Sequence, residues 1–349
     1  MSQILLYGAY GYTGKLIVRH AAAEGVDLVC AGRDHGRLRA VAEPHGMECR
    51  TFGLDDPAAM DRELSGIGVV IHAAGPFSRT SKPMADACLR NGVHYTDITG
   101  EIEVFEALAA RDGEARARGV MLMPGTGFDV VPSDCLAVHL ARQLPDATHL
   151  GLAFAGLGGG ISHGTAMTMV ENLHRGGLVR RDGELVSVPT GSLTTEVDFG
   201  RGPRPAMAIP WGDVATAWRS TGIPNIEVYV PMSRAAIAGA RLLGHLGGLL
   251  GSKPVQRLLK WQVERRPAGP SDAQRAGGKS ILVGWVRDDA GATATARLTT
   301  PEGYTLTAHA SLAIARRALA GDAPIGYQTP AMAYGPDIVA SLGGSIEAP

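Results

Sequence analysis

The sequence predicts an α/β protein with a doubly wound parallel sheet at the N-terminus and a second α+β domain built on a mainly antiparallel sheet. In the first third of the chain, short apolar runs alternate with helical patterns, as expected for parallel strands joined by helices. After residue 124, short turns join the predicted strands, and short turns cannot hold the crossovers that parallel strands need. The strands expected in the first sheet lie near residues 3–7, 26–31, 48–52, 68–73, 93–96 and 119–123.

A glycine-rich turn follows the first predicted strand. Gly8, Gly11 and Gly14 come after an apolar run at residues 4–7 and open a helical pattern that ends near Glu24. Glycines permit a tight turn and close approach of the backbone, while the helix N-terminus favours phosphate, so this order predicts a dinucleotide site in a Rossmann-type domain. The residues of this turn expected to bind the cofactor are Gly8, Tyr10, Gly11, Tyr12, Thr13 and Gly14.

Arg33 ends the second apolar run and selects between cofactors. An NAD site usually carries Asp or Glu at this place to accept a hydrogen bond from the ribose 2′-hydroxyl. A guanidinium cannot accept that bond, but its planar set of donors suits a 2′-phosphate, so NADP(H) is expected. The alternative is that Arg33 only ends a strand and Asp34 begins the next helix.

The fourth predicted strand runs into a second turn with small residues. This turn is expected at the carboxyl edge of the sheet, where small residues let a nicotinamide nucleotide lie close to the backbone. An ordinary turn at a strand end is the alternative. The expected contacts are Ala74, Gly75, Pro76 and Phe77.

Composition narrows the class of protein. A length of 349 residues suggests about two domains, and a formal net charge of −1 supplies no basic field, so nucleic acid is not an expected partner. The four cysteines stand singly, without the spacing of a zinc or redox site, which predicts buried thiols, no metal and a reducing, cytoplasmic compartment. No targeting segment is evident. Residues 147–170 contain no Asp, Glu, Lys or Arg, but glycines 158–160, His149 and His163 argue against a transmembrane helix.

Two domains are expected. Residues 1–131 would form the cofactor domain and residues 132–321 a substrate and dimerisation domain, giving a homodimer. Within residues 322–349, a capped helix from Thr329 to about Leu342 is expected to return to the first domain.

Several segments resemble the saccharopine dehydrogenase-like oxidoreductases, and the resemblance is strongest to the branch that contains trans-acting enoyl reductases. It implies an NADP-binding Rossmann domain, a mainly antiparallel second domain and hydride transfer from the nicotinamide. The matching segments are residues 8–15, 31–33, 74–77, 94–101, 127–134, 162–165, 180–183, 211–213 and 221–225.

Four residues are candidate catalytic donors or acids: Tyr95, Asp97, Asp129 and His163. Reduction of an enoyl thioester needs donors at the carbonyl oxygen and a proton for the α carbon, whereas an imine is activated by protonation. Each residue has a structural alternative. Tyr95 and Asp97 alternate on a strand end, but Asp97 could cap the next helix; Asp129 could lock its own turn, and His163 could cap a helix or bond within the core.

Residues 234–266 combine apolar and basic side chains at helical spacing. Such helices can lie on an anionic membrane or admit a lipid tail, which would favour an acyl substrate. Packing of a helix pair on the second sheet or across a dimer is the commoner arrangement.

The function expected from these features is NADPH-dependent reduction of an enoyl group in an acyl-type metabolite. Two alternatives stay open: an imine reductase or dehydrogenase of the saccharopine type, and a noncatalytic NADP(H)-binding protein at a lipid surface or in a complex.

Overall fold

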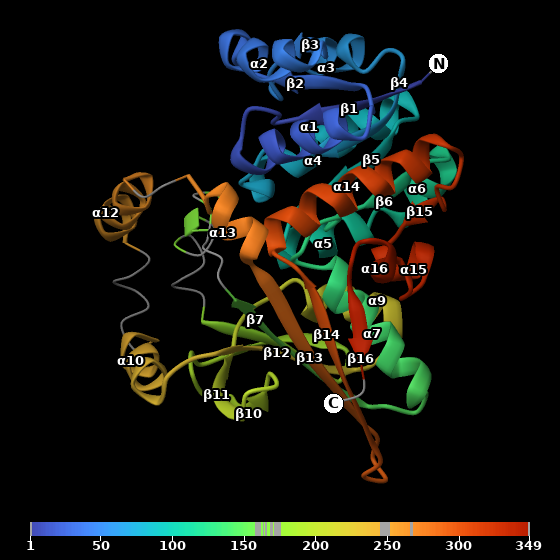
Figure 1. The fold of residues 1–349 in the computed structure, drawn as a ribbon. Coiled ribbons are helices and arrows are strands. Elements are labelled where there is room, and N and C mark those ends of the chain that lie inside the picture. Colours follow the sequence, from blue (N-terminus) through green and yellow to red (C-terminus); the bar gives the residue numbers. More distant parts are fainter. Residues whose placement is uncertain are drawn as a thin grey trace. The chain divides into compact units, whose positions relative to one another are not determined.

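The computed structural model describes residues 2–157, 162, 164, 166–167, 170, 176–244, 252–265 and 268–347. The chain divides into two compact units (Figure 1). Unit 1 comprises Met1–Val131 and Tyr304–Tyr334, and unit 2 comprises Pro132–Gly303 and Gly335–Pro349.

Unit 1 is built on a seven-stranded sheet in which every pair of neighbouring strands is parallel. Its strand order is β15-β6-β5-β4-β1-β2-β3, so the chain reverses direction across the sheet between β1 and β4. Ligands of such sheets bind outside the carboxyl ends of the strands at this reversal point. The strands are β1 (Gln3–Tyr7), β2 (Leu28–Gly32), β3 (Glu48–Thr51), β4 (Ile67–His72), β5 (His94–Asp97), β6 (Met121–Met123) and β15 (Gly326–Tyr327).

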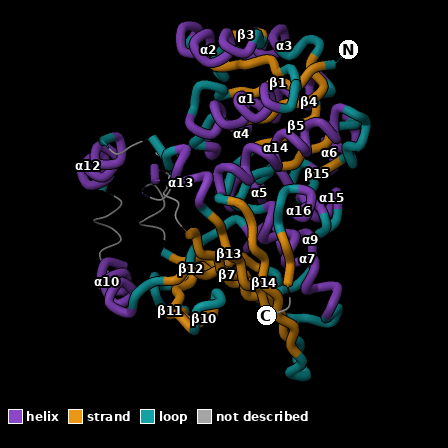
Figure 2. Tube along the Cα trace, viewed as in Figure 1, coloured by secondary structure: helices purple, strands orange, loops and turns teal. Residues whose placement is uncertain are grey.

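Helices alternate with these strands along the chain (Figure 2). Central strand residues such as Leu5, Val29 and Val70 are fully buried, as expected for parallel strands covered on both faces. The doubly wound fold predicted from the sequence is therefore confirmed. The helices are α1 (Tyr12–Ala23), α2 (His35–Ala42), α3 (Pro57–Glu63), α4 (Phe77–Asn91), α5 (Ile102–Ala109), α6 (Asp112–Arg118), α14 (Gly303–Leu319) and α15 (Pro330–Tyr334), with a 3₁₀ turn at Glu43–His45.

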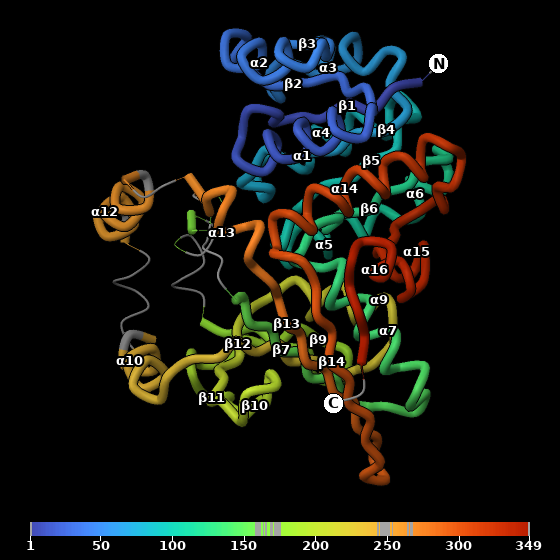
Figure 3. The backbone as a smooth tube through the Cα atoms, viewed as in Figure 1, coloured from blue at the N-terminus to red at the C-terminus, as the bar shows by residue number. Residues whose placement is uncertain are grey.

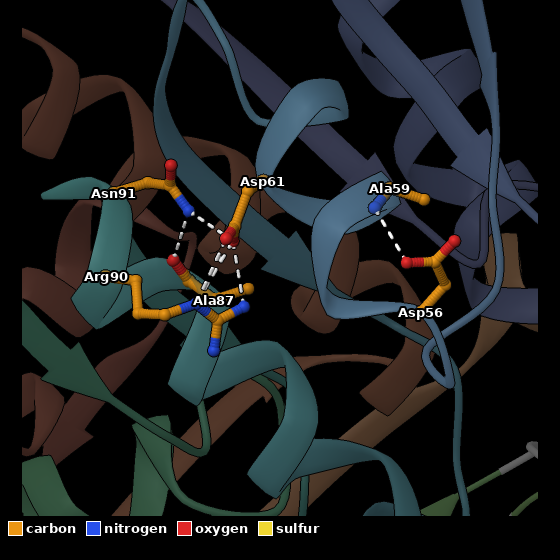
Figure 4. A network of polar contacts seen from close by, with 6 residues as sticks. All are labelled: Asp56, Ala59, Asp61, Ala87, Arg90 and Asn91. Atoms are coloured by element: carbon orange, nitrogen blue, oxygen red, sulfur yellow. Dashed lines mark hydrogen bonds and ion pairs between the residues drawn. The ribbon is translucent and has the colours of Figure 1, made fainter.

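Polar side chains fix how two of these helices begin and meet (Figure 4). Asp56 caps α3 by accepting a hydrogen bond of 3.0 Å from the Ala59 N–H. Asp61 of α3 accepts hydrogen bonds from Arg90 and Asn91 at the end of α4, which ties the two helices together.

Unit 2 contains a nine-stranded mixed sheet. Seven of its strands follow the order β10-β11-β12-β7-β13-β14-β16, and the other two are β8, which pairs with β12, and β9, which pairs with β8. Among the described strands of unit 2, only β12 and β7 pair in parallel, so the predicted, mainly antiparallel second sheet is also confirmed. The strands are β7 (His149–Leu157), β8 (Gly177–Arg181), β9 (Glu184–Val188), β10 (Thr194–Asp198), β11 (Pro203–Ala208), β12 (Asn225–Pro231), β13 (Lys279–Arg287), β14 (Thr293–Pro301) and β16 (Ser345–Glu347). The helices given for this unit are α7 (Val131–Gln143), α9 (Asp213–Thr221), α10 (Arg234–Gly244), α12 (Lys253–Glu264), α13 (Asp272–Gly277) and α16 (Ile338–Ser341).

The C-terminal part differs from the single helix expected between Thr329 and Leu342. Two short helices, α15 and α16, stand there instead. Gly335 adopts a positive φ of 76° and is followed by Pro336, which cannot donate the hydrogen bonds of a continuing helix. The chain also joins unit 1 earlier, from Tyr304, and Figure 3 shows this segment in red among the elements of that unit.

Within the part of the chain that the structure describes, no helix is long and apolar enough to cross a membrane. The described residues likewise contain no group of three or more His, Cys, Asp or Glu that could hold a metal ion. Cys30, Cys88 and Cys135 are buried thiols, and Cys49 is partly exposed.

Candidate functional site

The turn after β1 requires glycine at two positions. Gly8 has a φ of 90°, and a Cβ there would lie 2.9 Å from the carbonyl carbon and oxygen of Ala73. A Cβ at Gly14 would lie 2.3 Å from the carbonyl oxygen of Gly8. These contacts are with backbone atoms, which cannot move aside, so any side chain would push the turn out of shape. The turn after β1 therefore lies directly against the chain that leaves β4, at the reversal point of the sheet.

Helix α1 begins next to this turn. Its N-cap residue is Gly11, so no side chain caps the helix there, and the Gly11 N–H donates to the Gly8 carbonyl over 2.9 Å. The positive end of a helix that lacks a side-chain cap is suited to bind phosphate. The glycine contacts and the helix N-terminus together fit a pyrophosphate.

Cations gather where β2 ends. Arg33 is exposed, and the Arg37 guanidinium lies 4.4 Å from the centroid of the Tyr10 ring. The Asp34 carboxylate accepts a hydrogen bond of 3.0 Å from the Arg37 N–H and so caps α2. This carboxylate is thus occupied in holding the helix, while Arg33 keeps its donors at the surface.

A surface hollow lies between α1 and α2. Its volume is about 460 Å³, and its lining includes Tyr10, Lys15, Arg19 and Arg37 but no carboxylate. A hollow lined by cations and lacking acidic groups attracts anions. Tyr10 of the glycine turn and Arg37 of α2 both line it, which makes this region suited to a phosphate-bearing ligand.

Two side chains hold the turn after β4. The Glu101 carboxylate accepts hydrogen bonds of 2.8 Å from both the Phe77 and the Ser78 N–H, and so caps the start of α4 from the loop after β5. The Thr80 hydroxyl lies 2.7 Å from the Ala74 carbonyl oxygen, to which it donates. The backbone of residues 74–77 is therefore tied at both ends.

Tyr95 and Asp97 form a buried pair at the end of β5. The Tyr95 hydroxyl donates to Asp97 Oδ2 over 2.6 Å, and Asp97 Oδ1 accepts from the Thr99 and Gly125 N–H groups, each at 2.9 Å. Both side chains are completely buried. Burial raises the pKa of Asp97 to about 6 and that of Tyr95 well above its usual value. Asp97 thus joins the loops after β5 and β6 and does not cap α5, whose N-cap residue is Glu101.

Asp129 lies in the loop after β6 and is half-buried. A Cβ at Gly100 would lie 2.7 Å from Asp129 Oδ2, so the carboxylate packs directly against the loop after β5. Loss of water around it raises the pKa of Asp129 to about 7. This group can therefore gain or lose a proton near neutral pH.

The fourth candidate, His163, lies outside the described residues. The structure adds two residues that the sequence analysis did not single out. Glu101 caps α4, and His72 is fully buried within 5.6 Å of the Tyr7 ring and 5.4 Å of the Phe77 ring, measured between centroids. Burial lowers the pKa of His72 to about 3, so it stays neutral. The position of Glu101 at the end of the segment 94–101 was the one available signal, but its partners lie 23 and 24 residues away in the sequence.

Known proteins resemble the part of unit 1 that contains the turns after β1 and β4. Residues 4–123 match the family model described as the saccharopine dehydrogenase NADP binding domain. The match covers about a third of the chain. The matched segment spans β1 to β6 and includes the glycine turn, Arg33 and the turn at residues 74–77, and its cofactor is NADP(H).

Relatives extend the match beyond the NADP-binding domain. The trans-acting enoyl reductase of Mycobacterium leprae is 32% identical over 149 residues, which is 40% of this chain and 36% of that protein. A Mycobacterium tuberculosis relative is 31% identical over 183 residues, covering 49% of this chain and 44% of its own length. The matched part therefore spans less than half the length of these relatives.

A solved structure shares the fold of the whole chain. Saccharopine dehydrogenase (L-Glu forming) from Saccharomyces cerevisiae superposes with a TM-score of 0.67, with complete coverage of both chains. The two sequences are 13% identical, so this likeness concerns the fold alone.

Proposed function

We propose that this chain is an NADPH-dependent reductase that transfers hydride to the C=C bond of an enoyl group in an acyl-type metabolite. The observation that carries the proposal is its 31–32% identity to trans-acting enoyl reductases. The NADP-binding domain would hold the cofactor, and a carboxyl group with a pKa of about 7, that of Asp129, lies at the same sheet edge.

The turn after β1 is proposed to hold the cofactor pyrophosphate. Gly8, Gly11 and Gly14 would let the backbone approach it, with Tyr10, Tyr12 and Thr13 beside them in the same turn. Arg33 would bind the 2′-phosphate through its guanidinium, assisted by Arg37. Residues 74–77, tied down by Glu101 and Thr80, would line the nicotinamide end.

When bound at this site, NADPH would supply a hydride, with its two electrons, for the β carbon of the enoyl group. Negative charge then moves to the carbonyl oxygen, and a proton must reach the α carbon to complete the reduction. Asp129 is the proposed source of that proton, because a pKa of about 7 leaves a substantial protonated fraction at neutral pH. One hydride and one proton are thus added across the double bond.

Tyr95 and Asp97 are proposed to be positioning residues, which hold neighbouring loops in place. The Tyr95 hydroxyl already donates to Asp97, and both side chains are completely buried. Asp97 in turn accepts hydrogen bonds from the Thr99 N–H in the loop after β5 and from the Gly125 N–H in the loop after β6, which also carries Asp129. The pair would hold the loops after β5 and β6 at a fixed separation.

Imine reduction is the second candidate, favoured by the shared fold with a saccharopine dehydrogenase. There the electrophile would be a protonated C=N bond, and an acidic residue such as Asp129 would stabilise the iminium. A noncatalytic NADP(H)-binding role is the third candidate. For the second domain, residues 132–321, we propose substrate binding and assembly of a homodimer, with the protein acting in the cytoplasm.

A panel assay separates these candidates. NADPH binding is first measured by the change in its fluorescence, and NADPH oxidation is then followed with enoyl thioesters, cyclic imines and aldehydes in the same buffer. Turnover with enoyl thioesters supports the proposal, and turnover with imines alone moves it to the second candidate. Tight NADPH binding without turnover on any of the three classes favours the noncatalytic role.

A further inference from the structure

Helix α12 in unit 2 presents an exposed stripe that combines apolar and basic side chains. Trp261 lies four residues after Arg257 and three after Leu258, and Arg265 lies four residues after Trp261. Trp261 therefore neighbours the other three on one side of the helix, and all four side chains are exposed. Val263, on another side of the helix, is 6% exposed. The helix is amphipathic, but Leu258 and Trp261 lie on the side open to solvent.

These apolar residues are unusual within the protein. Leu258 is 54% exposed and Trp261 is 46% exposed, and Leu242 at the end of α10 is 68% exposed. Leu242 and Leu258 are the two most exposed large hydrophobic side chains among the described residues. Both belong to the basic segment, residues 234–266, that the sequence singled out (Figure 1).

The charges on the stripe have one sign. Its charged members are Arg257 and Arg265, and the Arg265 guanidinium lies 3.7 Å from the centroid of the Trp261 ring. An indole with a cation over its face has the combination of apolar body and charged tip that suits a membrane interface. A surface that pairs these groups needs apolar contact and negative charge in the same place.

We propose that this stripe docks on the surface of an anionic lipid bilayer. The 12 residues of α12 would extend for about 18 Å, too short to span a bilayer, so the helix would lie in the plane of the interface. Leu258 and Trp261 enter the boundary between headgroups and acyl chains, while Arg257 and Arg265 contact the lipid phosphates. Positive charge complements anionic headgroups, and the exposed apolar groups distinguish this surface from one that binds by charge alone.

The proposal goes beyond the reductase activity and does not rest on it. The proposed cofactor residues lie in unit 1, whereas α12 lies in unit 2. NADPH binding therefore reports on the fold of each variant independently of its binding to lipid.

Flotation of the full chain with vesicles tests the proposal. Vesicles of phosphatidylcholine containing phosphatidylglycerol are compared with vesicles of phosphatidylcholine alone, at low and high salt. We expect binding to the anionic vesicles that weakens as salt rises, because salt screens the arginine contacts. The double variant R257E/R265E is expected to bind at least ~10-fold more weakly, since each basic residue near the surface contributes about 1 kcal/mol.

The apolar part of the stripe is tested separately. L258S/W261S should also lose vesicle binding, whereas Trp261→Phe should keep it because the aromatic ring is retained. Ile325→Ser is the matched control, because Ile325 is as exposed as Trp261, at 46%, but lies in unit 1. All variants should bind NADPH as the unmodified chain does.

Three results would overturn the proposal. The first is that the unmodified chain does not float with anionic vesicles, and the second is that R257E/R265E and L258S/W261S bind them as well as the unmodified chain. The third is that L258S/W261S dissociates a dimer in sedimentation while vesicle binding is absent throughout, which would assign the stripe to a second copy of the chain.

Discussion

At the scale of single residues, the pKa of Asp129 has a direct kinetic consequence. Because desolvation raises this pKa to about 7, the carboxyl is protonated below that pH and loses its proton above it. If Asp129 donates the proton, kcat/KM for enoyl reduction should be level below pH 7 and fall about tenfold per pH unit well above it. Asp129→Asn should remove this descending limb and lower kcat by ~10²–10⁴-fold.

The control for Asp129 is NADPH affinity, which the Asn variant should keep because the substitution removes a charge but little volume. The substrate should have no group that titrates between pH 6 and pH 9. If kcat/KM for such a substrate stays constant over this range, Asp129 is excluded as the proton donor.

Arg33 carries a second prediction at the same scale. Arg33→Ala should weaken NADPH binding by roughly 10- to 150-fold, since a hydrogen bond to a charged group contributes about 1.5–3 kcal/mol. NADH binding should change little, because NADH has no 2′-phosphate. Titration of both cofactors by fluorescence measures the two effects.

Arg39→Ala is the matched control for Arg33. Arg39 is another exposed arginine of the same region but pairs with Glu43. Equal loss of NADPH and NADH affinity in Arg33→Ala would contradict the assignment of the 2′-phosphate to this residue.

At the scale of elements, the start of α4 depends on a side chain from a different loop. Glu101→Ala removes the acceptor for two helix N–H groups, and we expect it to lower the free energy of unfolding by ~1–2 kcal/mol. Because the same contact holds residues 74–77, NADPH affinity should fall as well. Glu101→Gln keeps one oxygen acceptor and should have a smaller effect on both quantities.

Chemical denaturation and cofactor titration of both Glu101 variants make this measurement. A matched comparison is Glu103→Ala, which changes an acidic residue in the first turn of α5. If Glu101→Ala leaves both unfolding and NADPH affinity unchanged, the capping contact does not position the turn at residues 74–77.

The elements differ in how well local sequence predicts them. The strand, glycine turn and helix at residues 3–23 were predictable because the apolar run, the glycine spacing and the helical pattern all lie within the segment. The contact of Glu101 with Phe77 and Ser78 was not predictable, because it joins two loops whose proximity follows from the parallel pairing of β4 with β5. The break between α15 and α16 had a local signal in Gly335-Pro336, and reading the segment as one helix gave that signal too little weight.

At the scale of the whole molecule, the feature least visible in the sequence was that residues 304–334 belong to unit 1. Residues 304–334 belong to it through nonlocal contacts such as the Ser311 hydroxyl donating to the Thr126 carbonyl over 3.1 Å, and the Phe128 N–H donating to the Thr307 hydroxyl over 3.0 Å. The sequence analysis singled out no helix at the position of α14, and helical periodicity alone does not show which sheet a helix packs against. The two fold classes were predictable because strand spacing alone distinguishes parallel crossovers from short antiparallel turns.

The distribution of tryptophan over the two units allows a test of how far they unfold together. The four tryptophans, at positions 211, 218, 261 and 285, belong to unit 2, whereas the NADP-binding domain lies in unit 1. The chain passes between the units three times, after residues 131, 303 and 334, so unfolding one unit removes constraints on the ends of the other. We therefore expect NADPH to raise the midpoint of the tryptophan-detected thermal transition, although it binds unit 1. NADPH at 100 times its Kd contributes about 2.7 kcal/mol to the stability of the unit that binds it. Arg33→Ala should abolish most of this shift at the same NADPH concentration, and a tryptophan transition that does not move with NADPH would mean that the units unfold independently.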